Sequence, residues 1–500
     1  MLSEIPLGSV TGDWQPLEAV FETPISNDRL NAFLFAIVFD GPGTLFVDQV
    51  TVYPEDAVNG FDPQVIEQMR MLHTGWVRWP GGNCASAYHW RNGIGPKDER
   101  PALPNPSWPG LGSNFVGTDE FMQFCQLTDI EPLICVNLGD GTADEAADWV
   151  EYCNGSVDSP MGKLRAENGH PEPYGVKYWN LGNELWGHWQ TGYCEAEEYS
   201  QRYQVFSRAM LERDPSLRLM VCAHGSHSTG NYKSWNSTLL EEIGKDIDLF
   251  DVHTYLRVEP RPEQSDEELL GLLTAIPVAY EQWLMEFRRE CIERGLDQIR
   301  VDVGEYNGSV TKRLPEDMNE IGRLLLFAGW VHGFIRQGDY VMGSNATEYS
   351  CFDPRAGQFD DLHPRYDLYR FYAAHAGTQP VSARLETPVK QSPNHQPKDL
   401  TPIFNLPMLD VVTLKDPEDH SLGIGIINRD MESEIPVEIS LEDFEPQQEG
   451  VCYFFGQNAG DDHAEFPKSH VKTETIDVRR RFSITVRPHS VVLLKVFESQ

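Results

Sequence analysis

The chain has 500 residues, and its 77 Asp and Glu residues outnumber its 40 Lys and Arg residues, which gives a formal net charge of −37. This charge repels phosphate backbones and argues against nucleic acids as partners, and no apolar run approaches the ~18 residues of a membrane span. The length exceeds one ordinary core, and 40% of the residues are apolar, so we expect two or three folded domains, or one large barrel with an accessory domain.

The first 55 residues contain two strand-like runs, Leu30–Phe39 and Thr44–Val52, which predict a short N-terminal β segment over residues 1–55. The N-terminus shows neither the basic region nor the apolar core of a signal peptide, so we expect a cytoplasmic location. The nine cysteines are scattered and form no Cys-x-x-Cys pair, which favours free thiols in a reducing compartment over disulfides or a zinc site.

Between residues 56 and 378, short apolar runs alternate with amphipathic helical stretches such as Ala143–Tyr152 and Ala196–Glu212. This alternation indicates parallel strands that are buried on both faces. Seven such units favour a (β/α)8 TIM barrel, an α/β fold, over an open doubly wound sheet. The predicted strands are Trp76–Trp79, Pro132–Leu138, Val176–Leu181, Arg218–Ala223, Leu249–Tyr255, Ile299–Gly304 and Tyr340–Gly343.

After residue 378 the helical period disappears, and alternating segments are separated by turn-rich connectors. These segments predict a C-terminal antiparallel β-sandwich over residues 379–500. They are Leu422–Asn428, Ile435–Ser440, Gly450–Phe455 and Phe482–Val496.

Two glutamates follow predicted strands at the end where barrels carry their active sites. Asn183 and Glu184 follow one strand, with Trp186 close behind, and aromatic neighbours would desolvate the carboxyl group and raise its pKa toward general-acid duty. Glu305 follows another strand, three strands further along the sheet. Such a pair is what glycoside cleavage requires, because one carboxyl protonates the leaving oxygen while the other attacks the anomeric carbon or activates water.

Further polar residues follow the same set of strands. Arg78 is followed by a Pro-Gly-Gly turn and by Asn83, where glycine allows a close backbone approach and the amide can bind sugar hydroxyls. His253 and Tyr255 lie on one face of a strand, because side chains alternate with a period of two. We expect these four side chains to line the site.

Several motifs in order resemble glycoside hydrolase family 51, the α-L-arabinofuranosidases. The resemblance extends to the C-terminus, where RPHSVVLLKV (487–496) is similar to the end of that family's β-sandwich. The other motifs are RWPGGN (78–83), YHWRNGIGP (88–96), GTDEFMQFC (117–125), ICVNLGDGTADEAADWVEYCNG (134–155) and KYWNLGNELWG (177–187).

The resemblance implies a retaining double displacement on terminal arabinofuranose of arabinan or arabinoxylan oligosaccharides. Glu184 matches the family's acid/base and Glu305 its nucleophile. Asn183 would bind the sugar's 2-hydroxyl, and Trp108 would form an aromatic wall. The resemblance further implies that Arg78, Asn83, His253 and Tyr255 line the sugar subsite. It also allows a homo-oligomer, and the negative charge favours a neutral oligosaccharide as substrate.

The chain departs from the family pattern at three places. Ser309 replaces an aromatic residue past the nucleophile, and Thr347 or Glu348 stands near the family's glutamine on the last strand. The family's first barrel strand is not recognisable, because residues 30–54 resemble the tail of a jelly-roll carbohydrate-binding module. Either Leu30–Phe39 serves as the first strand, or the barrel is incomplete, or another segment or subunit supplies it.

Three other functions compete with this interpretation. The first is a related glycosidase of other specificity, a β-xylosidase or an endo-β-glucanase, and the second is an inactive sugar-binding relative. The third is a metal-dependent hydrolase that uses His89, His188 and His253, but these residues lack His-x-x-x-His or His-Glu-x-x-His spacing. We therefore expect neither a metal nor a cofactor.

Overall fold

The computed structural model describes residues 5–22, 36–225, 232–258, 263–310, 315–347, 364–392, 403, 405–455 and 471–499. The chain divides into two compact units, Met1–Val50 with Phe352–Phe359, and Thr51–Cys351 with Asp360–Gln500. The barrel and the C-terminal sheets belong to the second unit. The predicted domain boundaries at residues 55 and 378 stay predictions.

The predicted N-terminal β segment is wrong for the residues that the structure describes. Residues 5–22 and 36–52 form neither helix nor strand, although Thr44–Val52 was expected to be a strand. Residues 36–39 of the Leu30–Phe39 run are not a strand either, and residues 30–35 lie outside the described part. Strand propensity expresses packing against neighbouring strands, whereas Val38 is 83% and Phe46 75% exposed here.

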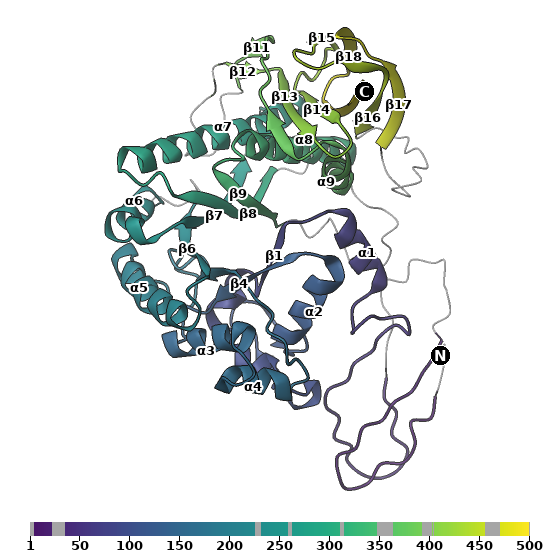
Figure 1. Ribbon diagram of the computed structural model, residues 1–500. Helices are drawn as coiled ribbons and strands as arrows, with labels where there is room; N and C mark the ends of the chain where they lie inside the picture. Colours follow the sequence, from purple (N-terminus) through teal and green to yellow (C-terminus); the bar gives the residue numbers. More distant parts are fainter. Residues whose placement is uncertain are drawn as a thin grey trace. The chain divides into compact units, whose positions relative to one another are not determined.

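All seven predicted barrel strands are confirmed, with ends that differ by a few residues, and they form one parallel sheet. Helices cover its outer face (Figure 1). In sheet order the strands are β1 (Trp76–Trp79), β4 (Glu131–Val136), β5 (Tyr178–Leu181), β6 (Arg218–His224), β7 (Leu249–Val258), β8 (Arg300–Val310) and β9 (Val341–Ala346).

The helical stretches predicted at Ala143–Tyr152 and Ala196–Glu212 are confirmed, as Ala143–Asn154 and Ala196–Arg213. Thr142 caps α3 by accepting a hydrogen bond from the Glu145 backbone N–H at 3.1 Å. The helices are α1 (Pro63–Met71), α2 (Thr118–Thr128), α3 (Ala143–Asn154), α4 (Pro160–Glu167), α5 (Ala196–Arg213), α6 (Tyr232–Glu242), α7 (Asp266–Glu293), α8 (Glu316–Arg336) and α9 (Pro364–His375). Short 3₁₀ turns are η1 (Gly82–Ala87), η2 (Trp90–Gly93), η3 (Lys97–Glu99) and η4 (Gly244–Asp246).

The barrel sheet is almost closed on itself. Within the described residues, β1 pairs only with β4 and β9 only with β8. The two end strands nevertheless touch, since a Cβ atom added to Gly343 of β9 would lie 2.1 Å from the Trp76 ring of β1. The TIM-barrel prediction is thus confirmed with seven strands described. The alternatives given above for the family's first barrel strand, which would be the eighth strand here, stay open.

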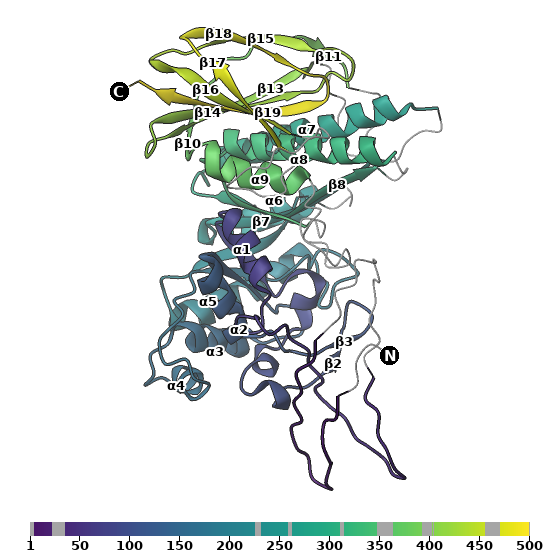
Figure 2. The same ribbon diagram turned by 90° about the vertical axis from the view of Figure 1, so that its right-hand side faces the viewer.

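The C-terminal sheets are antiparallel, which confirms the predicted β-sandwich. A six-stranded sheet shares a core with the pair β15 (Ile435–Ser440) and β18 (Arg481–Val486), and this core is built from side chains such as Ile424, Leu494 and Phe482. The predicted segment Phe482–Val496 is two strands, because Pro488 cannot continue the hydrogen-bonded ladder. Figure 2 shows these sheets beside α8, which contacts β13, β14 and β19.

The six strands in sheet order are β10 (Gln379–Val381), β13 (Leu409–Asp416), β14 (Ser421–Asn428), β19 (Ser490–Glu498), β16 (Pro446–Phe455) and β17 (Val471–Asp477). Three further antiparallel pairs join β15 (Ile435–Ser440) to β18 (Arg481–Val486), β11 (Val389–Lys390) to β12 (Leu406–Pro407), and β2 (Leu103–Pro104) to β3 (Leu111–Gly112).

A buried ionic cluster joins helix α8 to the C-terminal sheet. Asp410 of β13 accepts from His332 Nδ1 at 2.7 Å and from Arg336 Nη1 at 2.6 Å, and it also pairs with Arg429. Burial alone would raise the pKa of Asp410, but the Arg429 cation and the hydrogen bond from His332 hold it well below its ordinary value. Asp410 is therefore a carboxylate that compensates two arginines.

Removing this carboxylate is expected to destabilise the protein strongly. Asp410→Ala leaves Arg429 buried without its counter-ion, which costs about 3–5 kcal/mol of unfolding free energy. Urea unfolding monitored by circular dichroism measures this loss. Glu386→Ala is the matched control, because the Arg384–Glu386 pair is almost fully exposed and exposed pairs contribute little. Equal stability of the two variants would contradict the account.

Candidate active site

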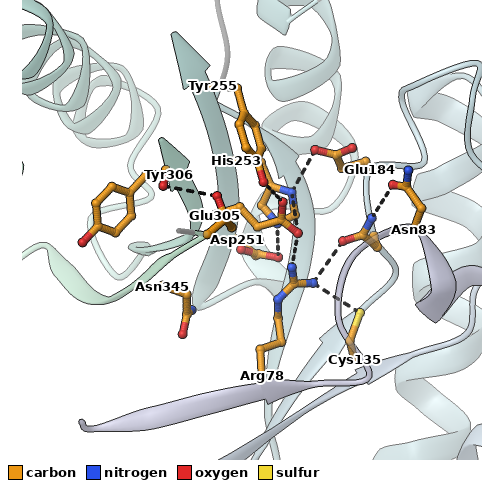
Figure 3. A network of polar contacts seen from close by, with 12 residues as sticks. Arg78, Asn83, Cys135, Glu184, Asp251, His253, Tyr255, Glu305, Tyr306 and Asn345 are labelled. Carbon is orange, nitrogen blue, oxygen red and sulfur yellow. Dashed lines mark hydrogen bonds and ion pairs between the residues drawn. The ribbon is translucent and has the colours of Figure 1, made fainter. Parts of the chain in front are cut away.

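Seven of the eight side chains predicted for the site meet at the C-terminal ends of the barrel strands (Figure 3). They come from different strands or from the loops that follow them. They are Arg78 on β1, Asn83 in η1, Asn183 and Glu184 after β5, His253 and Tyr255 on β7, and Glu305 on β8. This convergence is what the barrel topology predicts.

Glu305 is a buried carboxylate whose two oxygens are both held. Its Oε1 pairs with Arg78 Nη2, and its Oε2 accepts a hydrogen bond from the Tyr255 hydroxyl. His253 Nδ1 lies 3.6 Å from Oε1. Burial would raise the pKa of Glu305, but the positive charges of His253 and Arg78 and the Tyr255 hydrogen bond lower it below its ordinary value. Glu305 is thus ionised and fixed in orientation, as a nucleophile must be.

Glu184 stands on a strained turn directly after β5. Its φ of 48° lies in the left-handed region that non-glycine residues rarely adopt, and Gly182 two residues earlier has a φ of 96°. This turn places Glu184 Oε1 3.1 Å from His253 Nδ1. Oε2 accepts a hydrogen bond from Trp189 Nε1 at 3.2 Å. The carboxyl group is therefore aimed into the same site as Glu305.

The spacing of the two carboxyl groups has a chemical consequence. A carboxyl oxygen of Glu184, one of Glu305 and a ring nitrogen of His253 all lie within 4.8 Å of one another. Inverting glycosidases separate their two carboxyl groups by ~6.5–9.5 Å to admit a water molecule, whereas retaining enzymes hold them ~5–5.5 Å apart. The short spacing suits direct attack by one carboxylate.

A chain of amides continues from Arg78 toward the β5 loop. Arg78 Nη1 donates to Asn183 Oδ1 at 3.0 Å, and Asn183 Nδ2 donates to Asn83 Oδ1 at 3.4 Å. Gln190 Nε2 donates to the Asn83 carbonyl at 3.1 Å. Burial opposes the charge of Arg78, but Glu305 raises its pKa above the ordinary value, so it remains a cation. This series of hydrogen-bonded side chains places amide groups beside Glu305, where they can bind sugar hydroxyls.

The remaining residues that the sequence singled out differ in how they relate to this network. Trp108 stands between β2 and β3, is 58% exposed, and makes no ring contact to the other site residues in the described part of the chain. Its role as an aromatic wall stays a prediction. Thr347, which follows β9, hydrogen-bonds the Tyr255 hydroxyl, whereas Glu348 and the Ser309 side chain lie outside the described residues.

The sequence interpretation missed Asp251, which stands behind His253. Its Oδ2 lies 3.2 Å from His253 Nε2, and the two residues are two positions apart on β7. Burial would lower the pKa of His253, but the carboxylates of Glu305 and Asp251 raise it to about 10. The available signal was a charged residue inside the apolar run Leu-Phe-Asp-Val, on the same strand face as the histidine.

The structure bears on the metal alternative as well. In the described ranges, the only group of three donor side chains close enough to share an ion is Glu184, His253 and Glu305, which excludes the His89–His188–His253 set there. Both His253 nitrogens face carboxylates, and Arg78 already neutralises Glu305. A metal ligand must be a neutral imidazole. Glu184, His253 and Glu305 are therefore better suited to proton transfer and charge compensation than to binding a metal ion.

Comparisons with known proteins agree with this geometry. Residues 68–268 match the family model described as the α-L-arabinofuranosidase 1 domain. A probable α-L-arabinofuranosidase C of Aspergillus fumigatus is 46% identical over 182 residues, and the aligned stretch spans only 36% of this chain and 36% of that relative. The α-L-arabinofuranosidase C of Emericella nidulans is 31% identical over 388 residues, which cover 74% of this chain and 76% of that protein.

The fold is also similar to that of a solved α-L-arabinofuranosidase. The thermostable GH51 α-L-arabinofuranosidase from Thermotoga petrophila superposes with a TM-score of 0.71 at 27% sequence identity. The superposition covers 89% of this chain and 92% of that one.

Proposed function

The chain belongs to glycoside hydrolase family 51, the α-L-arabinofuranosidases, and from this premise we propose that it releases terminal α-L-arabinofuranosyl residues from neutral arabinan or arabinoxylan oligosaccharides. Glu305 is the nucleophile and Glu184 the acid/base of a retaining double displacement. The observation that carries these assignments is the pair of buried carboxyl groups, Glu184 after β5 and Glu305 on β8, which have oxygens within 4.8 Å of each other.

The two glutamates have different surroundings that suit different roles. Glu305 pairs with Arg78 and accepts a hydrogen bond from Tyr255, which keeps it ionised and fixed in orientation. Glu184 pairs with no arginine among the described residues, and its oxygens contact the neutral Trp189 indole and His253, which faces both glutamates. Environments that differ in this way assign the acid and the nucleophile within a carboxyl pair.

In the first step, a carboxylate oxygen of Glu305 attacks the anomeric carbon while Glu184 donates its proton to the glycosidic oxygen. The carbon–oxygen bond breaks, its electron pair leaves with the protonated alcohol, and a covalent glycosyl ester of Glu305 remains. The negative charge of Glu305 disappears in this step, and a negative charge forms on Glu184.

In the second step, Glu184 takes a proton from water, whose oxygen attacks the same carbon from the face that the alcohol left. The ester bond breaks and its electron pair returns to Glu305 as the carboxylate. Two inversions give net retention. Arg78 and Tyr255 orient the carboxylate in both steps, and Asn83 and Asn183 bind the sugar's hydroxyl groups.

The same proposal includes a cytoplasmic location. The described cysteines are free, and most of them are buried in the core, as in proteins of a reducing compartment. Two asparagines in Asn-x-Ser/Thr sequences make hydrogen bonds within the fold, since Asn154 bonds to Val176 and Asp214, and Asn236 bonds to the His224 backbone.

Among the described residues, no helix combines the length and apolarity that crossing a membrane requires.

The substrate and the nucleophile are tested together with aryl glycosides. The wild type is expected to prefer p-nitrophenyl α-L-arabinofuranoside to the β-xyloside and β-glucoside by kcat/KM. Glu305→Gly is expected to lower kcat by about 10³-fold or more, because no carboxylate remains to form the ester. Azide is expected to restore turnover in Glu305→Gly, because it can occupy the space left by the carboxylate and attack the anomeric carbon.

Glu195→Gln, an exposed glutamate in the loop after Glu184, is the control and keeps wild-type turnover. Saturable sugar binding without turnover of any of these glycosides would instead indicate an inactive relative. Wild-type turnover by Glu305→Gly would refute the assignment of the nucleophile.

The pH dependence tests the electrostatic part of the site. His253 and Arg78 lower the pKa of Glu305. In the pH profile of kcat/KM, the midpoint of the acidic limb is therefore expected below the ordinary glutamate pKa of about 4.3. His253→Gln removes one positive charge, so the pKa of Glu305 rises and the acidic limb moves up by about one pH unit. His188→Gln, an exposed histidine in the loop after Glu184, is the control and leaves the limb in place. An unmoved limb in His253→Gln would contradict the account.

A further inference from the structure

Two buried aspartates lie beneath the catalytic glutamates, and the mechanism above uses neither of them. Asp251 on β7 and Asp302 on β8 are register partners in the parallel sheet. Asp251 is 1% exposed and Asp302 is 0% exposed. Two neighbouring carboxyl groups in a barrel interior cannot both be charged without compensation, so their contacts decide which one is ionised.

Asp251 has the contacts of a carboxylate. Its Oδ2 accepts hydrogen bonds from the Asn180 amide and from His253 Nε2, the latter at 3.2 Å (Figure 3). The backbone leaves room for this group, since a Cβ atom added to Gly304 would lie 1.7 Å from Asp251 Oδ1. Although burial opposes ionisation, the cation of His253 lowers the pKa of Asp251.

Asp302 has no cationic partner within hydrogen-bonding distance in the described part of the chain. Its Oδ2 lies 3.5 Å from Asn345 Nδ2, and the Trp76 side chain supplies another neutral hydrogen bond. Its Oδ1 has no hydrogen-bond partner among the described residues. Burial first, and then the negative charge of Asp251, raise the pKa of Asp302 well above its ordinary value. Asp302 is therefore a neutral carboxylic acid.

His253 lies between Asp251 and both catalytic glutamates. Its Nε2 faces Asp251, and its Nδ1 lies 3.1 Å from Glu184 Oε1 and 3.6 Å from Glu305 Oε1. A neutral imidazole carries only one N–H, and if Nε2 donates it to Asp251, the Nδ1 lone pair faces the Glu305 carboxylate as well as Glu184. An imidazolium ring donates from both nitrogens and so fits the carboxylates on both sides of the ring.

The charges of the buried cluster then balance. The anions Asp251 and Glu305 are matched by the cations Arg78 and His253 when Glu184 holds its catalytic proton. Within the described ranges, the other titratable groups near this cluster are uncharged hydroxyls and thiols whose pKa values burial raises, and His224, the β6 register neighbour of His253, which stacks on Trp186. The uncharged groups are Cys135, Cys222, Tyr255 and Tyr280.

The reaction moves one negative charge within this cluster, from Glu305 to Glu184. His253 Nδ1 is within 3.6 Å of both carboxyl groups, so the same cation stands beside the charge before and after the first step. Because this positive charge is already in place, the groups around the site do not have to reorient as the negative charge moves.

We propose that Asp251 is a positioning residue that keeps His253 as an imidazolium, whose Nδ1–H is the fixed counter-charge of Glu305 before glycosyl transfer and of Glu184 after it. Asp302, its register partner on β8, holds a proton and contributes no charge. The inference rests on the proposed function, because it assumes that Glu305 and Glu184 exchange a charge.

The matched variants Asp251→Asn and Asp302→Asn test the proposal, because they make the same isosteric change on neighbouring strands. Asp251→Asn is expected to lower kcat/KM by about 10-fold to 100-fold, as when the carboxylate behind a functional histidine is removed. Asp302→Asn is expected to keep wild-type kcat/KM within about threefold, because an amide replaces a group that is already neutral. Equal losses in the two variants would overturn the proposal.

Histidine ¹⁵N NMR supplies a readout that a purely structural role would not change. His253 is assigned by its absence in His253→Gln, and both of its nitrogens are expected to be protonated at about pH 8 in the wild type and in Asp302→Asn, well above the ordinary histidine pKa of about 6.5. In Asp251→Asn the ring is expected to lose a proton at lower pH. A neutral ring in the wild type at this pH would overturn the proposal, even where Asp251→Asn does not fold.

These outcomes are separate from those that test the function. Full activity of Glu305→Gly would refute the nucleophile, whatever the protonation of His253. Conversely, a neutral His253 in an enzyme whose Glu305→Gly variant is inactive and rescued by azide would refute only the role of Asp251.

Discussion

The active site depends on two buried carboxyl groups being held within 4.8 Å of each other. Two carboxylates this close repel each other in a medium that screens charge poorly. Arg78 and His253 remove this conflict, because Arg78 pairs with Glu305 and His253 faces both Glu305 and Glu184. Each of these side chains lies on or just after a different strand, so the parallel barrel is what brings the compensating charges together.

The backbone is adapted to this charge cluster at specific positions. The residue before Glu305 is Gly304, where any side chain would collide with the carboxylate of Asp251. Glu184 adopts a left-handed conformation that costs ~1–3 kcal/mol for a non-glycine residue. Strain of this kind persists where the surrounding structure fixes it, and here the hydrogen bonds from His253 and Trp189 hold the strained carboxyl group in the site.

The sequence predicts the parts of the structure that depend on local pattern. The seven barrel strands are predicted as short, mainly apolar runs, and Glu184 and Glu305 come within three residues after two of these runs, so both could be proposed without coordinates. Asp251 could not, because its importance comes from contacts with Asn180 and His253 that only the folded sheet creates. The N-terminal residues 44–52 have strand-like composition but no pairing partner among the described residues, and strand formation is a property of pairs.

The central claim is that Glu305 attacks the sugar directly, which makes the enzyme retaining. The most direct measurement is proton NMR of the glycoside formed when p-nitrophenyl α-L-arabinofuranoside is turned over in the presence of methanol, because the methyl furanoside does not mutarotate. The spacing of Glu184 and Glu305 predicts methyl α-L-arabinofuranoside as the first product. Formation of the β anomer would contradict the account, since it would require a single displacement by a solvent molecule.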